Sequence, residues 1–164
     1  MKTTCTSLPE IQRTAGGAAL SALVLDLFKL SSRMLAAGDR LVADLGLTSA
    51  RWQVLGTIAA AARPQPVAWL ARDMGANRQN VQRIVNDLAN EGLVSLAPNP
   101  HHRRASLVVL TDRGQQAFGA AMCLQAPWIN RLAEGLAAWD IETTHGVILA
   151  VRRKLEEEGE AEEA

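Results

Sequence analysis

The stretch WLARDMGANRQNVQRIVNDLANEGLV, residues 69–94, contains the most informative pattern in the chain. Apolar residues recur in it at spacings of three and four, which is typical of helices that bury one face. Gly75 interrupts the pattern, and glycine suits the positive φ at which many helices end. Asn77 follows and can cap a new helix with its side chain. The stretch therefore predicts two helices, 67–75 and 77–91, joined by a tight turn.

The segment after this helix pair predicts a β-hairpin. LVSLAP (93–98) and ASLVVL (105–110) are short, rich in Leu and Val, and flank the turn NPHHRR. Asn99 and Pro100 favour that turn. Helix, tight turn, helix and hairpin, in this order, make a helix-turn-helix followed by a wing.

Longer helical patterns lie on both sides of this region. Further helices are predicted over about 17–45, from Thr48 or Ser49 to the break at RPQP (63–66), over 112–137 and over 141–158. Thr111 and Asp140 are expected to cap the last two, and Pro127 predicts a kink or local break. The chain has 48% apolar residues, only two Phe and no Tyr, and much of the apolar content is alanine, the strongest helix former. We therefore predict a mainly α protein with a small β-hairpin wing.

The formal charge is zero in sum but unevenly distributed. Six of the 17 acidic residues lie in the segment 156–164, which leaves the residues before it with 17 basic against 11 acidic side chains. Such asymmetry indicates a body that faces a polyanion and a solvated acidic tail. Charge alone equally allows scattered surface arginines beside a disordered end.

The cysteines and the apolar segments help to predict the cellular compartment of the protein. Cys5 and Cys123 lack metal-ligand spacing, and a reducing cytoplasm fits them best. No secretory signal is recognisable, and charges interrupt the segment 18–45 too often for a membrane span. We therefore expect a cytoplasmic protein with no membrane association and no cofactor.

The second helix of the pair has a polar face suited to DNA. Arg can pair with guanine, and Asn or Gln with adenine, through two hydrogen bonds in the major groove. The helix N-terminus itself attracts phosphate. The candidate contacts are Arg78, Gln79, Asn80, Gln82, Arg83 and Asn86, and no acidic residue precedes Asp87 on this helix. The plain alternative is a solvated helix face.

The hairpin tip is a second candidate contact. His101, His102, Arg103 and Arg104 are adjacent, and an arginine here can enter a narrow A·T-rich minor groove, where negative potential is concentrated. Histidines titrate near neutral pH, so they can add positive charge. Two adjacent histidines also allow a metal site, but the tip has no carboxylate or cysteine to complete the ligands, and we predict no metal. An exposed polar turn is the remaining alternative.

Residues 20–157 resemble the MarR family of winged-helix transcriptional regulators. The resemblance rests on LTSARWQVLGTIA, on the helix pair quoted above and on the wing HRRASLVVLT. The family's wing motif is Asp, any residue, Arg, five residues, then Leu-Thr. Arg104, Leu110 and Thr111 occupy its last three fixed positions. His102 stands where the family has an aspartate that orients the wing arginine.

The resemblance implies an obligate homodimer that binds a pseudo-palindromic DNA duplex. The apolar seams at both ends of the chain agree, because a monomeric winged-helix core would leave them partly uncovered. The predicted division is a flexible arm 1–16, a helical dimerisation region 17–46 and 112–158, a DNA-binding lobe 47–111 and a disordered acidic tail 159–164.

The resemblance also implies regulation by a small aromatic ligand, held between the dimerisation helices and the lobe. Candidate lining residues are Phe28, Met34, Trp52 and Trp128, although Trp and Met at helical spacing usually belong to a core. Some relatives sense oxidants through an N-terminal cysteine. Neither Cys5 nor Cys123 adjoins a Lys or Arg that would favour its thiolate, so a redox switch is the lesser alternative.

These observations together predict a homodimeric, sequence-specific regulator of transcription, a repressor that a small ligand releases from double-stranded DNA. The alternative is a winged-helix protein-interaction module that does not bind DNA, which the acidic tail slightly favours. An enzyme is not expected, because the three histidines come with no nucleophile–base pair or metal shell.

Overall fold

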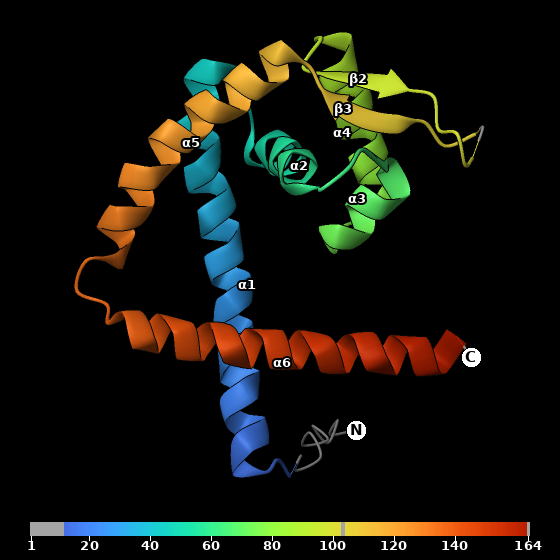
Figure 1. Ribbon diagram of the computed structural model, residues 1–164. Helices are drawn as coiled ribbons and strands as arrows, with labels where there is room; N and C mark the ends of the chain where they lie inside the picture. The colour runs from blue at the N-terminus through green and yellow to red at the C-terminus, as the bar shows by residue number, and fades with distance from the viewer. Residues whose placement is uncertain (1–11, 103, 164) are drawn as a thin grey trace, which may run out of the picture. The chain divides into compact units, whose positions relative to one another are not determined.

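The computed structural model describes residues 12–102 and 104–163, so Cys5 and Arg103 lie outside the described residues. The helices are α1 (Ala15–Val42), the short 3-10 helix η1 (Ala43–Leu45), α2 (Ser49–Ala60), α3 (Val67–Asp73), α4 (Arg78–Asn90), α5 (Asp112–Ala133) and α6 (Ala138–Glu163), and the strands are β1 (Gln65–Pro66), β2 (Val94–Ala97) and β3 (Leu107–Leu110) (Figure 1). The predicted class, mainly helical with a hairpin wing, is confirmed. The chain divides into two compact units within α5, between residues 121 and 122.

Helices α3 and α4 form the predicted pair, with ends within two residues of the expected ones. Gly75 in the turn has φ +61°, a left-handed conformation that glycine adopts without steric cost. The Asn77 side chain accepts a hydrogen bond from the Gln79 amide at 2.8 Å. Because that amide has no partner inside the first turn, the cap fixes where α4 begins.

The wing hairpin is confirmed and belongs to a three-stranded antiparallel sheet in the order β1-β3-β2. Val94 pairs with Leu110 and Ala97 with Leu107. Strand β1 was not predicted, because the prolines in RPQP indicated only the end of a helix. Its Gln65 pairs with Val108, and a proline is tolerated there because β1 is an edge strand. The pairing holds the segment 63–66 beside the base of the wing.

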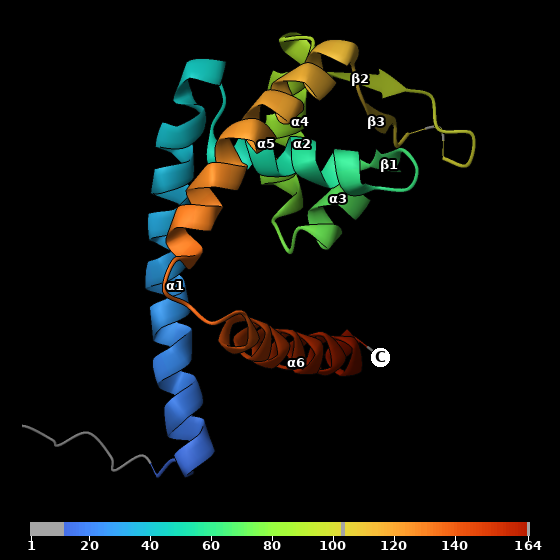
Figure 2. The ribbon, with the colours of Figure 1, turned by 60° about the vertical axis from the view of Figure 1, so that its left-hand side comes forward.

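The core of the first unit lies among α2, α3, α4 and the sheet, which contact one another directly. Figure 2 shows α2, α3 and α4 gathered beside the β2–β3 hairpin. The largest fully buried side chains of this core include Leu55, Leu70, Leu88, Val85 and Val108. They belong to α2, α3, α4 and β3, so one core holds both α4 and the base of the wing.

The start of α5 packs closely on the end of the hairpin. Thr111 caps the helix as predicted, since its hydroxyl accepts from the Gly114 amide at 3.0 Å and donates to the Gly92 carbonyl at 2.7 Å. A Cβ at position 114 would stand 1.9 Å from the Leu93 carbonyl oxygen. Only glycine therefore allows this approach of helix to strand.

Two long helices depart from the prediction. Helix α5 continues through Pro127, so the local break is absent. Helix α6 begins at Ala138, which places Asp140 inside the first turn and not at the cap, and it runs to Glu163 instead of ending at 158. Glutamate is a good helix former, and Arg152 pairs with Glu156 one turn on at 3.4 Å, so the acidic end can continue the helix. No described helix combines the length and apolar content that crossing a bilayer requires.

Candidate nucleic-acid interface

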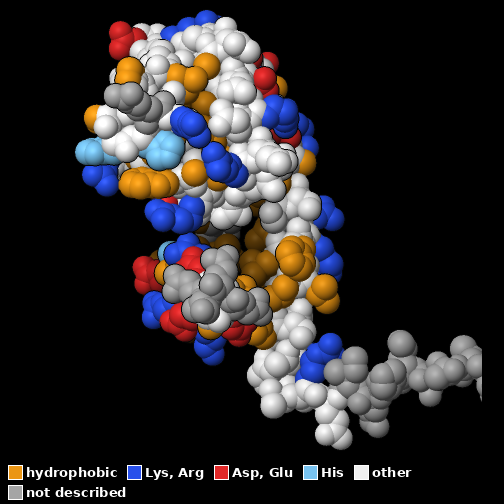
Figure 3. Space-filling view, turned by 90° about the vertical axis from the view of Figure 1, so that its right-hand side faces the viewer, with side chains coloured by type: hydrophobic (Ala, Val, Ile, Leu, Met, Phe, Trp, Pro, Cys, Tyr) orange, Lys and Arg blue, Asp and Glu red, His pale blue; other side chains and the backbone are white. Residues whose placement is uncertain are grey.

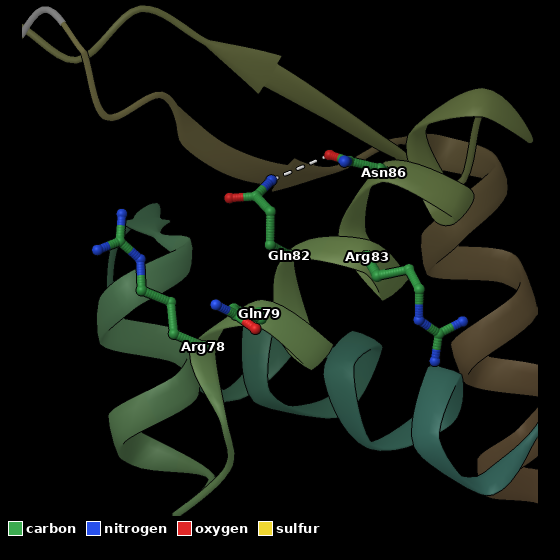
Figure 4. A pocket seen from close by; sticks show the side chains of 5 residues that line it. All are labelled: Arg78, Gln79, Gln82, Arg83 and Asn86. Atoms are coloured by element: carbon green, nitrogen blue, oxygen red, sulfur yellow. Dashed lines mark hydrogen bonds between the residues drawn. The ribbon is translucent and has the colours of Figure 1, made fainter.

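The outward side of α4 forms an open groove, which we call the α4 groove. It has a volume of about 530 Å³ and is lined by Arg78, Gln79, Gln82, Arg83 and Asn86 (Figure 4). The opposite side of the helix buries Val81, Val85 and Leu88 in the core. Asn80 is exposed on the same helix. The structure thus brings five of the six predicted α4 residues into one groove and leaves the sixth on the surface beside it.

Two amide side chains in the α4 groove are already paired with each other. Gln82 Nε2 donates to Asn86 Oδ1 at 3.0 Å, one helical turn away (Figure 4). Within this pair, the Gln82 oxygen remains an acceptor and the Asn86 amide nitrogen remains a donor, at opposite ends of the pair (Figure 4). Each amide can therefore offer a hydrogen bond to a base edge, and Asn and Gln are the side chains that pair with adenine.

The two arginines of the α4 groove, Arg78 and Arg83, differ in their ion-pair partners. Figure 4 shows that Arg78 and Arg83 extend away from the amide pair in opposite directions. Arg83 lies 3.7 Å from the Asp87 carboxylate, and both side chains are more than half exposed, so this pair is weak. Arg78 pairs with no carboxylate among the residues that the structure describes. Both guanidinium groups are therefore available to a polyanion.

A polar network outside the groove fixes the C-terminal end of α4. Arg51, at the start of α2, forms an ion pair with Glu91 and donates to the Gly46 carbonyl at 3.0 Å. Arg113 on α5 donates to the Glu91 carbonyl at 2.7 Å. No sequence pattern indicated this network, because its members lie far apart in the chain.

The tip of the wing is closed by Asn99. Its amide nitrogen donates to the Ala105 carbonyl at 2.9 Å, and its oxygen accepts from the His101 amide at 3.0 Å. The Ala105 amide in turn donates to the His102 carbonyl at 3.0 Å. Asn99 was predicted only as a turn residue. In the structure its side chain hydrogen-bonds to both sides of the wing tip, close in sequence to Arg104. The motif position two residues before Arg104 holds His102 and not aspartate.

The wing cations face solvent. His102 and Arg104 are exposed, and Arg103 lies outside the described residues. Among the described residues, no three His, Cys, Asp or Glu side chains come together in a group that could hold a metal. The tip therefore presents positive and titratable groups that no protein carboxylate neutralises in the described part of the chain.

A second hollow, the wing hollow, lies between the wing and the helix pair. Its volume is about 610 Å³, and its lining comes from the segment before α3, the first turn of α3, the start of α4 and the wing. The lining residues are Arg63, Pro64, Pro66, Ala68, Trp69, Arg78, Asn99, Pro100, His101, His102, Arg104, Ala105 and Leu107. A smaller hollow of about 170 Å³ shares Arg78 and Arg104 with it and reaches Gln82. Figure 3 shows Lys, Arg and His side chains gathered around hydrophobic ones on this face, in the upper part of the view. Seven of the predicted residues, Arg78, Gln79, Gln82, Arg83, Asn86, His102 and Arg104, thus line one continuous surface.

The surface also includes residues that were not predicted, and two of them carry a charge or an aromatic ring. Arg63 and Trp69 both line the wing hollow. The Arg63 guanidinium lies 5.7 Å from the centre of the Trp69 ring, and that of Arg72 lies 5.8 Å from it. Helical spacing shows only that Trp69 lies outside the buried face of α3. It does not distinguish Trp69 from the other exposed residues of that helix.

The residues predicted for a ligand pocket are spread over several elements. Phe28 and Met34 lie on α1, where Phe28 is exposed and Met34 half-buried, and Trp52 on α2 packs against the core. Trp128 belongs to the other compact unit. The pocket stays a prediction. Cys123 is exposed on α5, not buried.

Comparison with known proteins places this geometry in context. The model of the MarR family matches residues 45–105. A Mycobacterium tuberculosis protein, Rv2011c, is 37% identical over 125 residues, which cover 76% of this chain and 86% of the relative. The transcriptional activatory protein BadR of Rhodopseudomonas palustris is 30% identical over 98 residues, covering 58% and 56% of the two chains.

Solved structures share the fold. CouR of Rhodococcus jostii, bound to p-coumaroyl-CoA, aligns with a TM-score of 0.70 at 20% identity, over 79% of this chain and 90% of that one. The transcriptional repressor CouR bound to a 23-mer DNA duplex aligns with a TM-score of 0.71 at 22% identity, over 86% and 99%. At these identities the likeness concerns the fold alone.

Proposed function

Because this chain belongs to the MarR family of transcriptional regulators, we propose that it is a homodimeric, sequence-specific regulator that binds double-stranded DNA. The observation that carries the proposal is the continuous surface from the α4 groove to the wing hollow. It is rich in Arg, Gln, Asn and His, and none of the acidic residues that the structure describes lines any of its three hollows. Such a surface complements a phosphate backbone and the edges of bases.

In this proposal, α4 lies in the major groove. Its paired amides, Gln82 and Asn86, read an A·T base pair, and Arg78 and Arg83 contact guanine or the backbone. The wing enters the adjacent minor groove with Arg104, and Asn99 holds the loop in shape. A wing that is ordered before binding loses less conformational entropy on contact.

Dimerisation is supported by the apolar side chains that the chain leaves exposed. On α1 these include Leu25 and Phe28, and on α6 Trp139, Ile141 and Leu155. Large apolar side chains exposed in this number usually mark an interface. Two copies related by a two-fold axis would present two α4 helices to a pseudo-palindromic site.

We further propose that DNA binding represses transcription and that a small aromatic ligand relieves it. A dimer bound at a promoter excludes RNA polymerase by its bulk alone, whereas an activator needs a surface that recruits the polymerase. CouR is a repressor and BadR an activator, so a reporter placed behind the operator, with and without the regulator, decides the direction. Ligand binding would lie near Phe28, Met34 and Trp52.

The salt dependence of binding to the DNA upstream of the protein's own gene tests the proposal. Specific binding whose affinity falls steeply with salt is expected, because each phosphate contact releases a counterion. Arg104→Ala should weaken binding by on the order of tenfold and make the logarithmic salt slope shallower by about one. Arg40→Ala on α1, an exposed arginine that lines none of the three hollows, is the control. If no duplex binds above background even at low salt, the chain is a protein-interaction module instead.

A further inference from the structure

The cluster of Arg63, Trp69 and Arg72 lies at the margin of the interface described so far. Trp69 is 42% exposed, although a tryptophan ordinarily contributes most when it is buried. The guanidinium groups of Arg63 and Arg72 lie 5.7 and 5.8 Å from its ring centre, within the range of a cation–π interaction. The chain therefore holds a large aromatic ring at the surface between two positive charges.

The approach to this cluster is stiff. Pro64 and Pro66 restrict the backbone on both sides of Gln65, and Gln65 pairs with Val108 of β3. Arg63 is thus attached to the sheet that carries the wing, while Trp69 belongs to α3. Groups that are ordered before binding lose little conformational entropy when a ligand arrives.

The charges of the two arginines are not equivalent. Arg72 Nε lies 3.8 Å from the Asp73 carboxylate, which compensates part of its charge. Arg63 pairs with no carboxylate among the residues that the structure describes. Arg63 also lines the wing hollow, together with Arg78 and Arg104. The hollow therefore combines three uncompensated guanidinium groups with an apolar wall that includes Trp69.

The position of the hollow suggests what fills it. If α4 occupies a major groove and the wing the adjacent minor groove, one sugar–phosphate strand must pass between them. Arg78 at the start of α4 and Arg104 on the wing line both the wing hollow and the smaller hollow beside it. That strand would therefore run along the wing hollow.

Resting on the proposed function, we infer that the wing hollow binds this sugar–phosphate strand, with Arg63 on a phosphate oxygen and Trp69 packed against a deoxyribose. The chemistry fits both parts of the ligand. A guanidinium forms charge-assisted hydrogen bonds with phosphate, and the exposed ring offers an apolar surface to the sugar. A peptide partner would need acidic side chains at the same spacing, whereas a DNA backbone provides regularly spaced negative charge.

Neutral phosphate substitution on the DNA tests this assignment. A duplex that the wild-type protein binds specifically is prepared with single methylphosphonate linkages, one position at a time, so that each duplex lacks one negative charge. At one backbone position, the methylphosphonate should lower the affinity of wild type on the order of tenfold. The same substitution should leave the affinity of Arg63→Ala unchanged, because this variant no longer contacts that phosphate. Arg63 is exposed, so its substitution leaves the fold intact.

Trp69 has its own readout. Trp69→Ala should lower affinity about threefold to tenfold with the salt slope unchanged, because the ring carries no charge, and Trp69→Phe should recover part of the loss. The control is Gln53→Ala on α2, because Gln53 is exposed and lines none of the three hollows. Circular dichroism checks that each variant is folded.

The outcomes separate this inference from the proposed function. If wild type binds no duplex, the proposed function fails. Another outcome is that wild type binds and every methylphosphonate position lowers the affinity of Arg63→Ala as much as that of wild type. In that case the wing hollow does not hold the backbone, and the inference alone fails. A Trp69→Ala variant with wild-type affinity would likewise remove Trp69 from the interface.

Discussion

Helices α4 and α6 use their side chains in opposite ways. Helix α4 buries Val81, Val85 and Leu88 in the core of its own chain and exposes amides and guanidinium groups. None of the α6 residues whose side chains the structure describes is buried, and Trp139 and Leu155 are 66% and 63% exposed. The chain thus positions α4 by itself, whereas the apolar residues of α6 need an additional surface.

This difference separates two tasks. The lobe is built to hold a polar face in a fixed orientation, which sequence-specific contact with DNA requires. The exposed apolar residues of α6 suit association with a second copy, which would set the spacing of two lobes on an operator. Each prediction below changes one side of the comparison and leaves the other intact.

The largest effect is expected in the core under α4. Leu88 is fully buried, so Leu88→Ala leaves a cavity and should lower the free energy of unfolding by about 2–5 kcal/mol. Leu96→Ala on β2 is the control, because Leu96 is 49% exposed and its truncation should cost less than about 1 kcal/mol. Urea denaturation at one protein concentration measures both. Equal losses would show that the core does not anchor α4.

The exposed apolar residues of α6 should affect assembly. The double variant Ile141→Asp/Leu155→Asp places two charges on these exposed positions and should raise the dimer dissociation constant at least about tenfold, because burying an unpaired charge is costly. Sedimentation across a dilution series measures the shift, and Glu142→Ala/Lys154→Ala is the neighbouring control. A wild type that sediments as one chain at every concentration would contradict the proposed dimer.

The amide pair on α4 should affect base preference and not stability. Gln82→Ala should cost about 1–3 kcal/mol of discrimination at one A·T position. Because Gln82 donates to Asn86 at 3.0 Å, the loss in Gln82→Ala/Asn86→Ala should be smaller than the sum of the two single losses. Selection from randomised duplexes measures the preference, with Gln53→Ala on α2 as control. Additive losses would mean that the two amides act separately.

The smallest effect is expected at the wing. His102 is exposed at the tip, and its imidazole N–H can donate to a phosphate oxygen, so His102→Ala should lower affinity about twofold to threefold. His145→Ala on α6 is the control and should leave the affinity unchanged. Fluorescence anisotropy at constant ionic strength follows the binding. Equal affinities for wild type and His102→Ala would count against a role for this imidazole.

Much of the lobe could be predicted from local pattern. Gly75, Asn77 and Thr111 lie at helix boundaries that both sequence and structure identify, because caps and tight turns depend on neighbouring backbone groups. The errors have physical causes as well. Pro127 was expected to kink or break α5, and the break does not occur because a long helix tolerates the loss of one hydrogen bond. The acidic end of α6 stays helical because glutamate favours the helix.

The helix pair, the hairpin and the polar face of α4 could be predicted from the amino-acid sequence, because each follows from local spacing and turn residues. Three contacts became visible only in the folded chain: Arg63 and Trp69 line one hollow with the wing, Asn99 closes the wing tip onto Ala105, and Arg51 pairs with Glu91. Periodicity records which side of an element is buried. It does not record which distant element covers that side, because this depends on how all the elements pack together.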